Sequence, residues 1–103
     1  MMQRTIRSDP HRALMRALVA RADGVHVESS SSQPWASVTF TGARHKATLR
    51  IGSTHAADRF AEGIDVAEFM LPGHILADIE IVARRPVPDG IFLDLEALTV
   101  EDS

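Results

Sequence analysis

The sequence predicts one α+β domain over residues 1–103, with a mainly antiparallel sheet of about five strands and two or three helices packed on one face. Two segments repeat apolar residues at helical spacing, and other segments alternate apolar with polar residues, as half-buried strands do. The expected order is helix, three strands, helix, two strands, with short connections and without the strand–helix–strand repeat of parallel sheets. With 45% hydrophobic residues among 103, the chain can bury a core without a metal or disulfide.

The first helix is expected to begin at Ser8-Asp9-Pro10 and to end before Gly24. A capping side chain followed by proline is typical of a helix start, and glycine favours a helix end. Between these signals, apolar residues recur three and four positions apart at Leu14, Met15, Leu18, Val19 and Ala22. The polar residues 1–8 are expected to be flexible.

A short strand is expected to begin at Val25 and Val27 and to run into the polar, serine-rich residues 29–34. These residues offer no apolar side chains to bury, so we expect a mobile loop there. Trp35 follows the loop and opens the next strand, where its ring is expected to cover the core.

Alternation then predicts a hairpin with strands at residues 36–41 and 46–51. Its turn is either the first two or all four of residues 42–45, because glycine at the first position suits a tight hairpin turn. Both choices place Phe40 and Leu49 on the same face of the sheet.

Ser53 and Thr54 can cap a second helix. Its apolar residues repeat three and four positions apart at Ala57, Phe60, Ala61 and Ile64. The stretch from Asp65 to Leu71 either extends this helix past a kink or forms a separate helix or strand before Pro72-Gly73.

Two long alternating strands end the chain, joined by a turn over residues 84–90 that contains two prolines and Asp89-Gly90. We assume a register centred on residue 87 for its symmetry. This register pairs apolar residues on the core face. On the opposite face it places four carboxylates between two apolar pairs, with Leu76 opposite Leu98, Asp78 opposite Glu96, Glu80 opposite Asp94, and Val82 opposite Phe92.

Charge is divided along the chain, because residues 1–55 hold eight Arg or Lys against three acids and residues 56–103 hold three against eleven. Carboxylates that face one another across strands destabilise a sheet by on the order of 0.2–1 kcal/mol per pair, so nearby cations are expected. The polar side of the preceding strand offers Arg44, Lys46 and Arg50. If that strand lies beside the terminal hairpin, salt bridges would cross the sheet.

Three interpretations of this charged face compete. It is a solvated or internally paired surface, a homodimer interface in which basic rows meet acidic rows, or a carboxylate site for acid–base chemistry or a hard cation such as Ca²⁺. The apolar residues Leu76, Val82, Phe92 and Leu98 favour an interface. We therefore expect a small non-enzymatic binding or oligomerisation module that forms a homodimer or binds another protein. Its expected interface comprises Arg44, Lys46, Arg50, Leu76, Asp78, Glu80, Val82, Phe92, Asp94, Glu96 and Leu98.

The alternative is a small enzyme or metal-binding protein that uses a histidine rim. His45, His55 and His74 each lie near the end of an expected element and can converge, with Asp58 on the same helical face as His55. The sequence contains none of the paired spacings of zinc motifs and no glycine-rich phosphate loop. We expect no cofactor.

Composition also bears on location and partners. The chain has no cysteine, which excludes thiol chemistry and disulfides. A net charge of −3 argues against nucleic-acid binding, which usually requires a basic surface. The chain shows no signal-peptide pattern and no apolar run long enough to cross a bilayer, so we expect a cytoplasmic protein without a membrane partner. Abundant Arg beside the single Lys46 is typical of GC-rich bacterial genomes.

Overall fold

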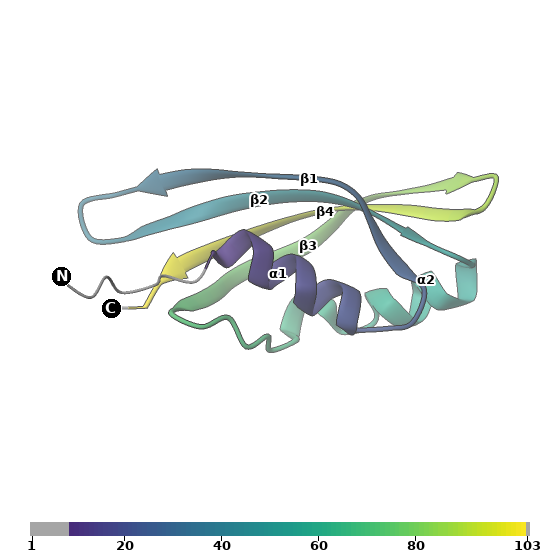
Figure 1. Cartoon of the computed structure of the whole chain (residues 1–103), viewed down its shortest axis with the longest axis horizontal. Coiled ribbons are helices and arrows are strands. Elements are labelled where there is room, and N and C mark those ends of the chain that lie inside the picture. The colour runs from purple at the N-terminus through teal and green to yellow at the C-terminus, as the bar shows by residue number, and fades with distance from the viewer. Residues whose placement is uncertain (1–8, 103) are drawn as a thin grey trace, which may run out of the picture.

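The computed structural model describes residues 9–102 and contains two α-helices on one face of a four-stranded antiparallel sheet (Figure 1). The sheet order is β1-β2-β4-β3. The α+β class is confirmed, although the sheet has four strands where about five were predicted. The prediction that residues 1–8 are flexible lies outside the described residues. The elements are α1 (Pro10–Ala20), β1 (Val25–Ala36), β2 (Thr41–Ile51), α2 (Thr54–Ala61), the 3₁₀ helix η1 (Ile64–Val66), β3 (His74–Val87) and β4 (Gly90–Glu101).

Both α-helices begin at side-chain caps that the sequence predicted. The Asp9 carboxylate accepts hydrogen bonds from the backbone N–H groups of His11 and Arg12, and the Ser53 hydroxyl accepts one from the backbone N–H of Ala56 in the first turn of α2. Gly63 adopts a left-handed conformation with φ of 69° just after α2, which ends that helix. The segment after it forms η1 and then irregular structure, so no residue from Asp65 to Leu71 belongs to an α-helix or a strand.

The serine-rich segment was predicted to be a loop, and this prediction is wrong. The segment forms the middle of β1. Residues 29–34 pair with β2 throughout, from Ser29 opposite Thr48 onwards. Backbone hydrogen bonds in a ladder do not require apolar side chains, which is why the composition of this segment misled the prediction. The expected short strand and the expected loop are therefore one strand, Val25–Ala36, and the strand expected at residues 36–41 does not form, which explains the lower strand count.

The turn between β1 and β2 lies at residues 37–40 and not at residues 42–45. It is closed by the Ser37 backbone N–H, which donates to the Phe40 carbonyl at 2.7 Å, and by the Ser37 hydroxyl, which accepts from the Phe40 N–H at 3.1 Å. Phe40 is 54% exposed in this turn, so it does not share the core face with Leu49.

The hairpin of β3 and β4 turns at Pro88-Asp89, and its register differs from the symmetric one that was predicted. Bulges lie between Leu76 and Asp78 and between Ile81 and Ala83. Each bulge adds one residue to β3 without a partner on β4 and so shifts the pairing. The observed pairs include Ile79 with Ala97, Ile81 with Leu95, and Glu80 with Glu96.

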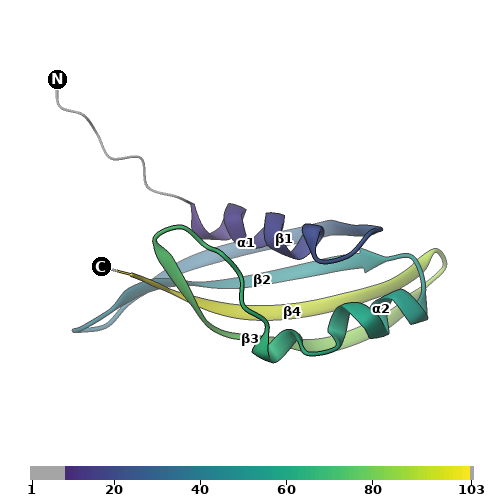
Figure 2. The same ribbon diagram turned by 90° about the horizontal axis from the view of Figure 1, so that it is seen from below.

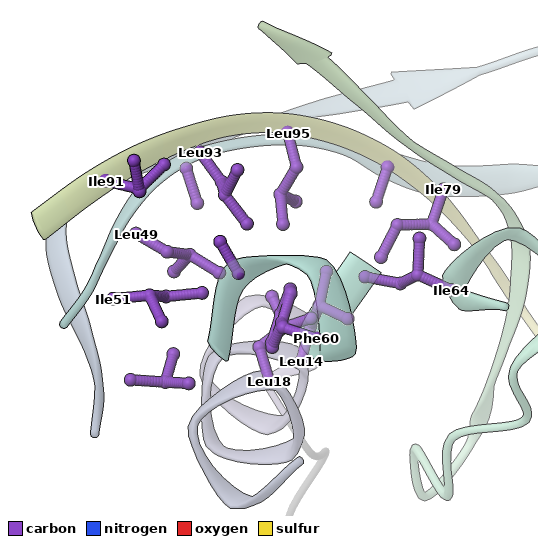
Figure 3. Close-up of a cluster of buried hydrophobic side chains, with 14 of the residues drawn as sticks. Leu14, Leu18, Leu49, Ile51, Phe60, Ile64, Ile79, Ile91, Leu93 and Leu95 are labelled. Carbon is purple, nitrogen blue, oxygen red and sulfur yellow. The ribbon is translucent and has the colours of Figure 1, made fainter. Parts of the chain in front are cut away.

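The core lies between the helices and the central strands β2 and β4. Figure 3 shows Leu14 and Leu18 of α1 and Phe60 of α2 facing side chains of the sheet. The sheet contributes Leu49, Ile51, Leu93 and Leu95, each at most 1% exposed. Burial of one such side chain contributes roughly 1.5–3 kcal/mol, so this cluster is the main source of stability.

The Trp35 ring was expected to cover this core, but it does not. It pairs with Gly42 on the side of the sheet that faces away from the helices. Among the described residues, no helix combines the length and the apolar content needed to cross a membrane.

Gly42 allows close contact between the central strands. A Cβ atom there would overlap the Thr99 carbonyl oxygen of β4 and would also approach the Trp35 ring nitrogen. We predict that Gly42→Ala lowers the free energy of unfolding by about 1–3 kcal/mol, because the strands must move apart. Gly52→Ala is the matched control, since nothing lies within 4 Å of its Cβ position. Urea unfolding measures both variants, and equal stabilities would contradict the close contact.

Candidate functional site: the open face of the sheet

The face of the sheet that points away from α1 and α2 is the candidate site, and we call it the open face. Figure 2 shows both helices on the other side of the sheet. Neighbouring residues across β1, β2, β4 and β3 form five rows on the open face. In order along the strands the rows are Trp35, Gly42, Val100 and Ile75; Gln33, Arg44, Leu98 and Asp78; Ser31, Lys46, Glu96 and Glu80; Ser29, Thr48, Asp94 and Ala83; and His26, Arg50, Phe92 and Arg85.

Nine of the eleven residues predicted to form the interface belong to these rows. They are Arg44, Lys46, Arg50, Asp78, Glu80, Phe92, Asp94, Glu96 and Leu98. Leu76 instead pairs with Thr99 and packs against the core, because the first bulge of β3 reverses the alternation. Val82 is the extra residue of the second bulge and is 48% exposed beside the centre of the open face.

The strand order places basic β2 directly beside acidic β4, but the expected ladder of salt bridges between them is replaced by other contacts. Arg85 of β3 donates two hydrogen bonds to Asp94, at 2.8 and 2.9 Å, and Thr48 donates a third at 2.6 Å. The Arg85 hydrogen bonds, followed by that of Thr48, lower the pKa of Asp94. Arg50 pairs with Glu28 at 3.0 Å. Asp94 and Arg50 therefore already have partners within the chain.

Five other charges of the open face have no ion pair or hydrogen bond from their side chains to another described residue. These charges are Arg44, Lys46, Asp78, Glu80 and Glu96. Glu96 lies between Glu80 on β3 and Lys46 on β2, so two carboxylates share one neighbouring cation. Such an arrangement leaves negative charge that a partner can compensate.

A shallow depression of about 340 Å³ lies at the centre of the open face. Around it lie Ser31, Lys46, Thr48, Val82, Asp94 and Glu96. The serine and threonine side chains are short, so the long charged side chains beside them stand above the floor of the depression. A flat surface with a shallow centre suits contact with another protein surface better than enclosure of a small molecule.

Apolar side chains flank the charged centre. Ile75 is 52% exposed, and Leu98 and Val100 are half-buried near the same end of the sheet. Phe92 lies towards the other end, where the Arg85 guanidinium lies 5.3 Å from the centre of its ring. The open face thus combines apolar and charged groups, as protein interfaces do.

The opposite face contains a second group of polar residues, which the sequence did not indicate. The imidazole of His11 on α1 stacks on that of His45 on β2, with ring centres 5.2 Å apart and the two Nδ1 atoms 3.0 Å apart. His45 Nε2 lies 2.9 Å from the Thr99 hydroxyl, and His11 Nε2 lies 2.9 Å from the Ser30 hydroxyl. Four side chains from α1, β1, β2 and β4 therefore form one hydrogen-bonded chain.

Both imidazoles can be neutral in this chain. Either Thr99 donates to His45, His45 to His11 and His11 to Ser30, or every donor and acceptor is reversed. Two protonated rings would bring two N–H groups together. The pKa of His45 is lowered to about 4, first because burial disfavours the charged ring and second because His11 lies beside it, while Asp9 acts in the opposite direction.

The predicted histidine rim does not form. His74 Nδ1 lies 3.0 Å from the Pro72 carbonyl, Asp58 pairs with Arg84 at 2.6 Å, and His55 is exposed at the start of α2. Within residues 9–102, no three His, Asp or Glu side chains gather in a way that could hold a metal ion. Of the rim residues, only His45 joins the chain described above, and its partner His11 is 34 positions away without a linking motif.

Comparison of the chain with protein families, curated proteins and solved structures gives no match.

Stability should fall as the pH falls from about 6.5 to about 4. Unfolded histidine titrates near pH 6.5, whereas His45 in the folded protein titrates near pH 4. Between these values the unfolded state binds the additional proton, so acid favours unfolding by up to about 3 kcal/mol from this residue. Urea unfolding at several pH values measures the effect.

His45→Gln should weaken this pH dependence, whereas His55→Gln, at an exposed position, should retain it. The comparison uses the slope of stability against pH and not the absolute stability. A wild-type slope in His45→Gln would show that another group causes the dependence.

Proposed function

We propose that the protein is a small non-enzymatic association module of the cytoplasm that binds a second copy of itself through the open face. The observation that carries this proposal is the set of unpaired charges and exposed apolar side chains on the face without helices. Two helices bury the other face of the same sheet. The open face is therefore the face of the sheet that a partner can cover.

The charge pattern supports a second copy as the partner. Unpaired cations lie on β2, at Arg44 and Lys46, and unpaired carboxylates lie on β3 and β4, at Asp78, Glu80 and Glu96. A surface with both signs in separate areas is complementary to itself after a suitable rotation.

The size of the face also agrees with a dimer interface. Four strands about 4.8 Å apart and about ten residues long span roughly 600 Å². Two such faces bury roughly 1,200 Å² together, at the lower end of the range for specific protein interfaces. We therefore expect a dimer that dissociates on dilution.

Three features favour association over catalysis. The carboxylates lie side by side on a sheet surface, whereas catalysis usually takes place in a concave pocket that excludes water. Asp94, the most strongly hydrogen-bonded of them, is held ionised by Arg85. His45 is only 1% exposed, so a substrate cannot reach its ring without movement of α1.

Sedimentation velocity over a dilution series tests the proposal. We predict a monomer–dimer equilibrium that shifts to the monomer as salt rises, since salt screens exposed charges. Leu98→Ser should raise the dissociation constant at least about tenfold, because it removes an apolar contact of the open face in the row next to the charged centre. Met70→Ser is the matched control, since Met70 is 91% exposed and lies outside the sheet.

A wild-type protein that stays monomeric at every concentration would contradict the proposed function. Equal weakening by Leu98→Ser and Met70→Ser would contradict the role of the open face.

A further inference from the structure

The unpaired charges of the open face divide it along the direction of the strands. Arg44 and Lys46 lie on the half formed by β1 and β2, whereas Asp78, Glu80 and Glu96 lie on the half formed by β4 and β3. The dividing line runs between β2 and β4, which is the middle of the sheet. One half is therefore basic and the other acidic.

This division distinguishes between two ways of stacking two copies with full overlap. A two-fold axis parallel to the strands exchanges the halves, so β2 lies over the partner's β4 and β1 lies over the partner's β3. A two-fold axis perpendicular to the strands, in the plane between the sheets, places β2 over the partner's β2 and β4 over the partner's β4. The second arrangement brings like charges together, which costs free energy at an interface.

We infer that two copies pack face to face about an axis parallel to the strands, with Lys46 of each chain against the partner's Glu96. This inference rests on the proposed function and specifies its arrangement. Full overlap of four strands requires the axis to lie midway between β2 and β4, where Lys46 and Glu96 are direct neighbours within one chain. The rotation then places Lys46 of each chain opposite the partner's Glu96.

The position of this pair makes it the most reliable point of contact. Lys46 and Glu96 belong to the third of the five rows, at the centre of the open face. Packed sheets cross at about 30°, which displaces residues at the corners but hardly moves those at the centre. Ser31 and Thr48 beside the pair have short side chains, so the central depression leaves room for the partner's long ones.

The arrangement also relieves the charge imbalance within one chain. Glu80 and Glu96 face each other on β3 and β4, and the cation in their row is Lys46. A second ammonium group, the partner's Lys46, would lie over Glu96. Neither Lys46 nor Glu96 has another ion-pair partner among residues 9–102, so both are available for this contact.

Charge reversal tests the arrangement. Lys46→Glu places carboxylates against carboxylates, and Glu96→Lys places ammonium groups against ammonium groups, so each variant alone should bind itself at least about tenfold more weakly than wild type. An equimolar mixture of the two should form a heterodimer, because both contacts then join opposite charges. The double variant Lys46→Glu/Glu96→Lys should recover self-association for the same reason.

Matched controls separate this contact from the change in net charge. Arg12→Glu changes the charge as Lys46→Glu does, and Glu68→Lys changes it as Glu96→Lys does, at exposed positions outside the sheet. Both controls should associate like wild type. Thermal unfolding of each variant by circular dichroism confirms that the fold is retained before association is compared.

Sedimentation velocity on the single variants, their mixture and the double variant gives the result. Recovery of the dimer in the mixture supports the inferred arrangement. Weakened single variants without recovery in the mixture would overturn it while leaving association through the open face intact, as would single variants that associate like wild type. A wild-type monomer at all concentrations would overturn the proposed function itself.

Discussion

Packing of α1 and α2 against one face of the sheet is the constraint on which the rest of the structure depends. Leu14, Leu18 and Phe60 reach the central strands from the helices, and Leu49 and Leu93 reach back from the sheet (Figure 3). A chain of 103 residues supplies only these two α-helices within the part that the structure describes. One face is therefore buried, and the other is left to solvent or to a partner.

Polar contacts fix α1 at both of its ends on this core. At its start, His11 stacks on His45 and reaches Ser30. At its end, the Arg21 side chain donates to the Phe60 carbonyl at 2.8 Å and to the Glu62 carbonyl at 2.7 Å, where α2 ends. These contacts hold the helices beside each other. His45, whose pKa is lowered, points towards the helices because it alternates along β2 with the open-face residues Arg44 and Lys46.

The helices, and the alternation of apolar and polar residues along the strands, could be predicted from the sequence because local signals determine them. Asp9 and Ser53 cap the helices as expected, and the charged side of β2 lies beside the acidic side of β4 as the charge division suggested. Pairing was harder to predict, since polar composition conceals the middle of β1 and the bulges of β3 have no sequence signature. The contact between His11 and His45 depends on how α1 lies across the sheet, which no local pattern specifies.

Concentration-dependent NMR measures most directly whether the open face is covered in solution. On dilution, the methyl signals of Leu98 and Val100 should shift, because they leave an interface, while those of Leu14 and Leu18 in the core should stay unchanged. Signals of Leu98 and Val100 that do not change with concentration, or changes confined to α1, would contradict association through the open face.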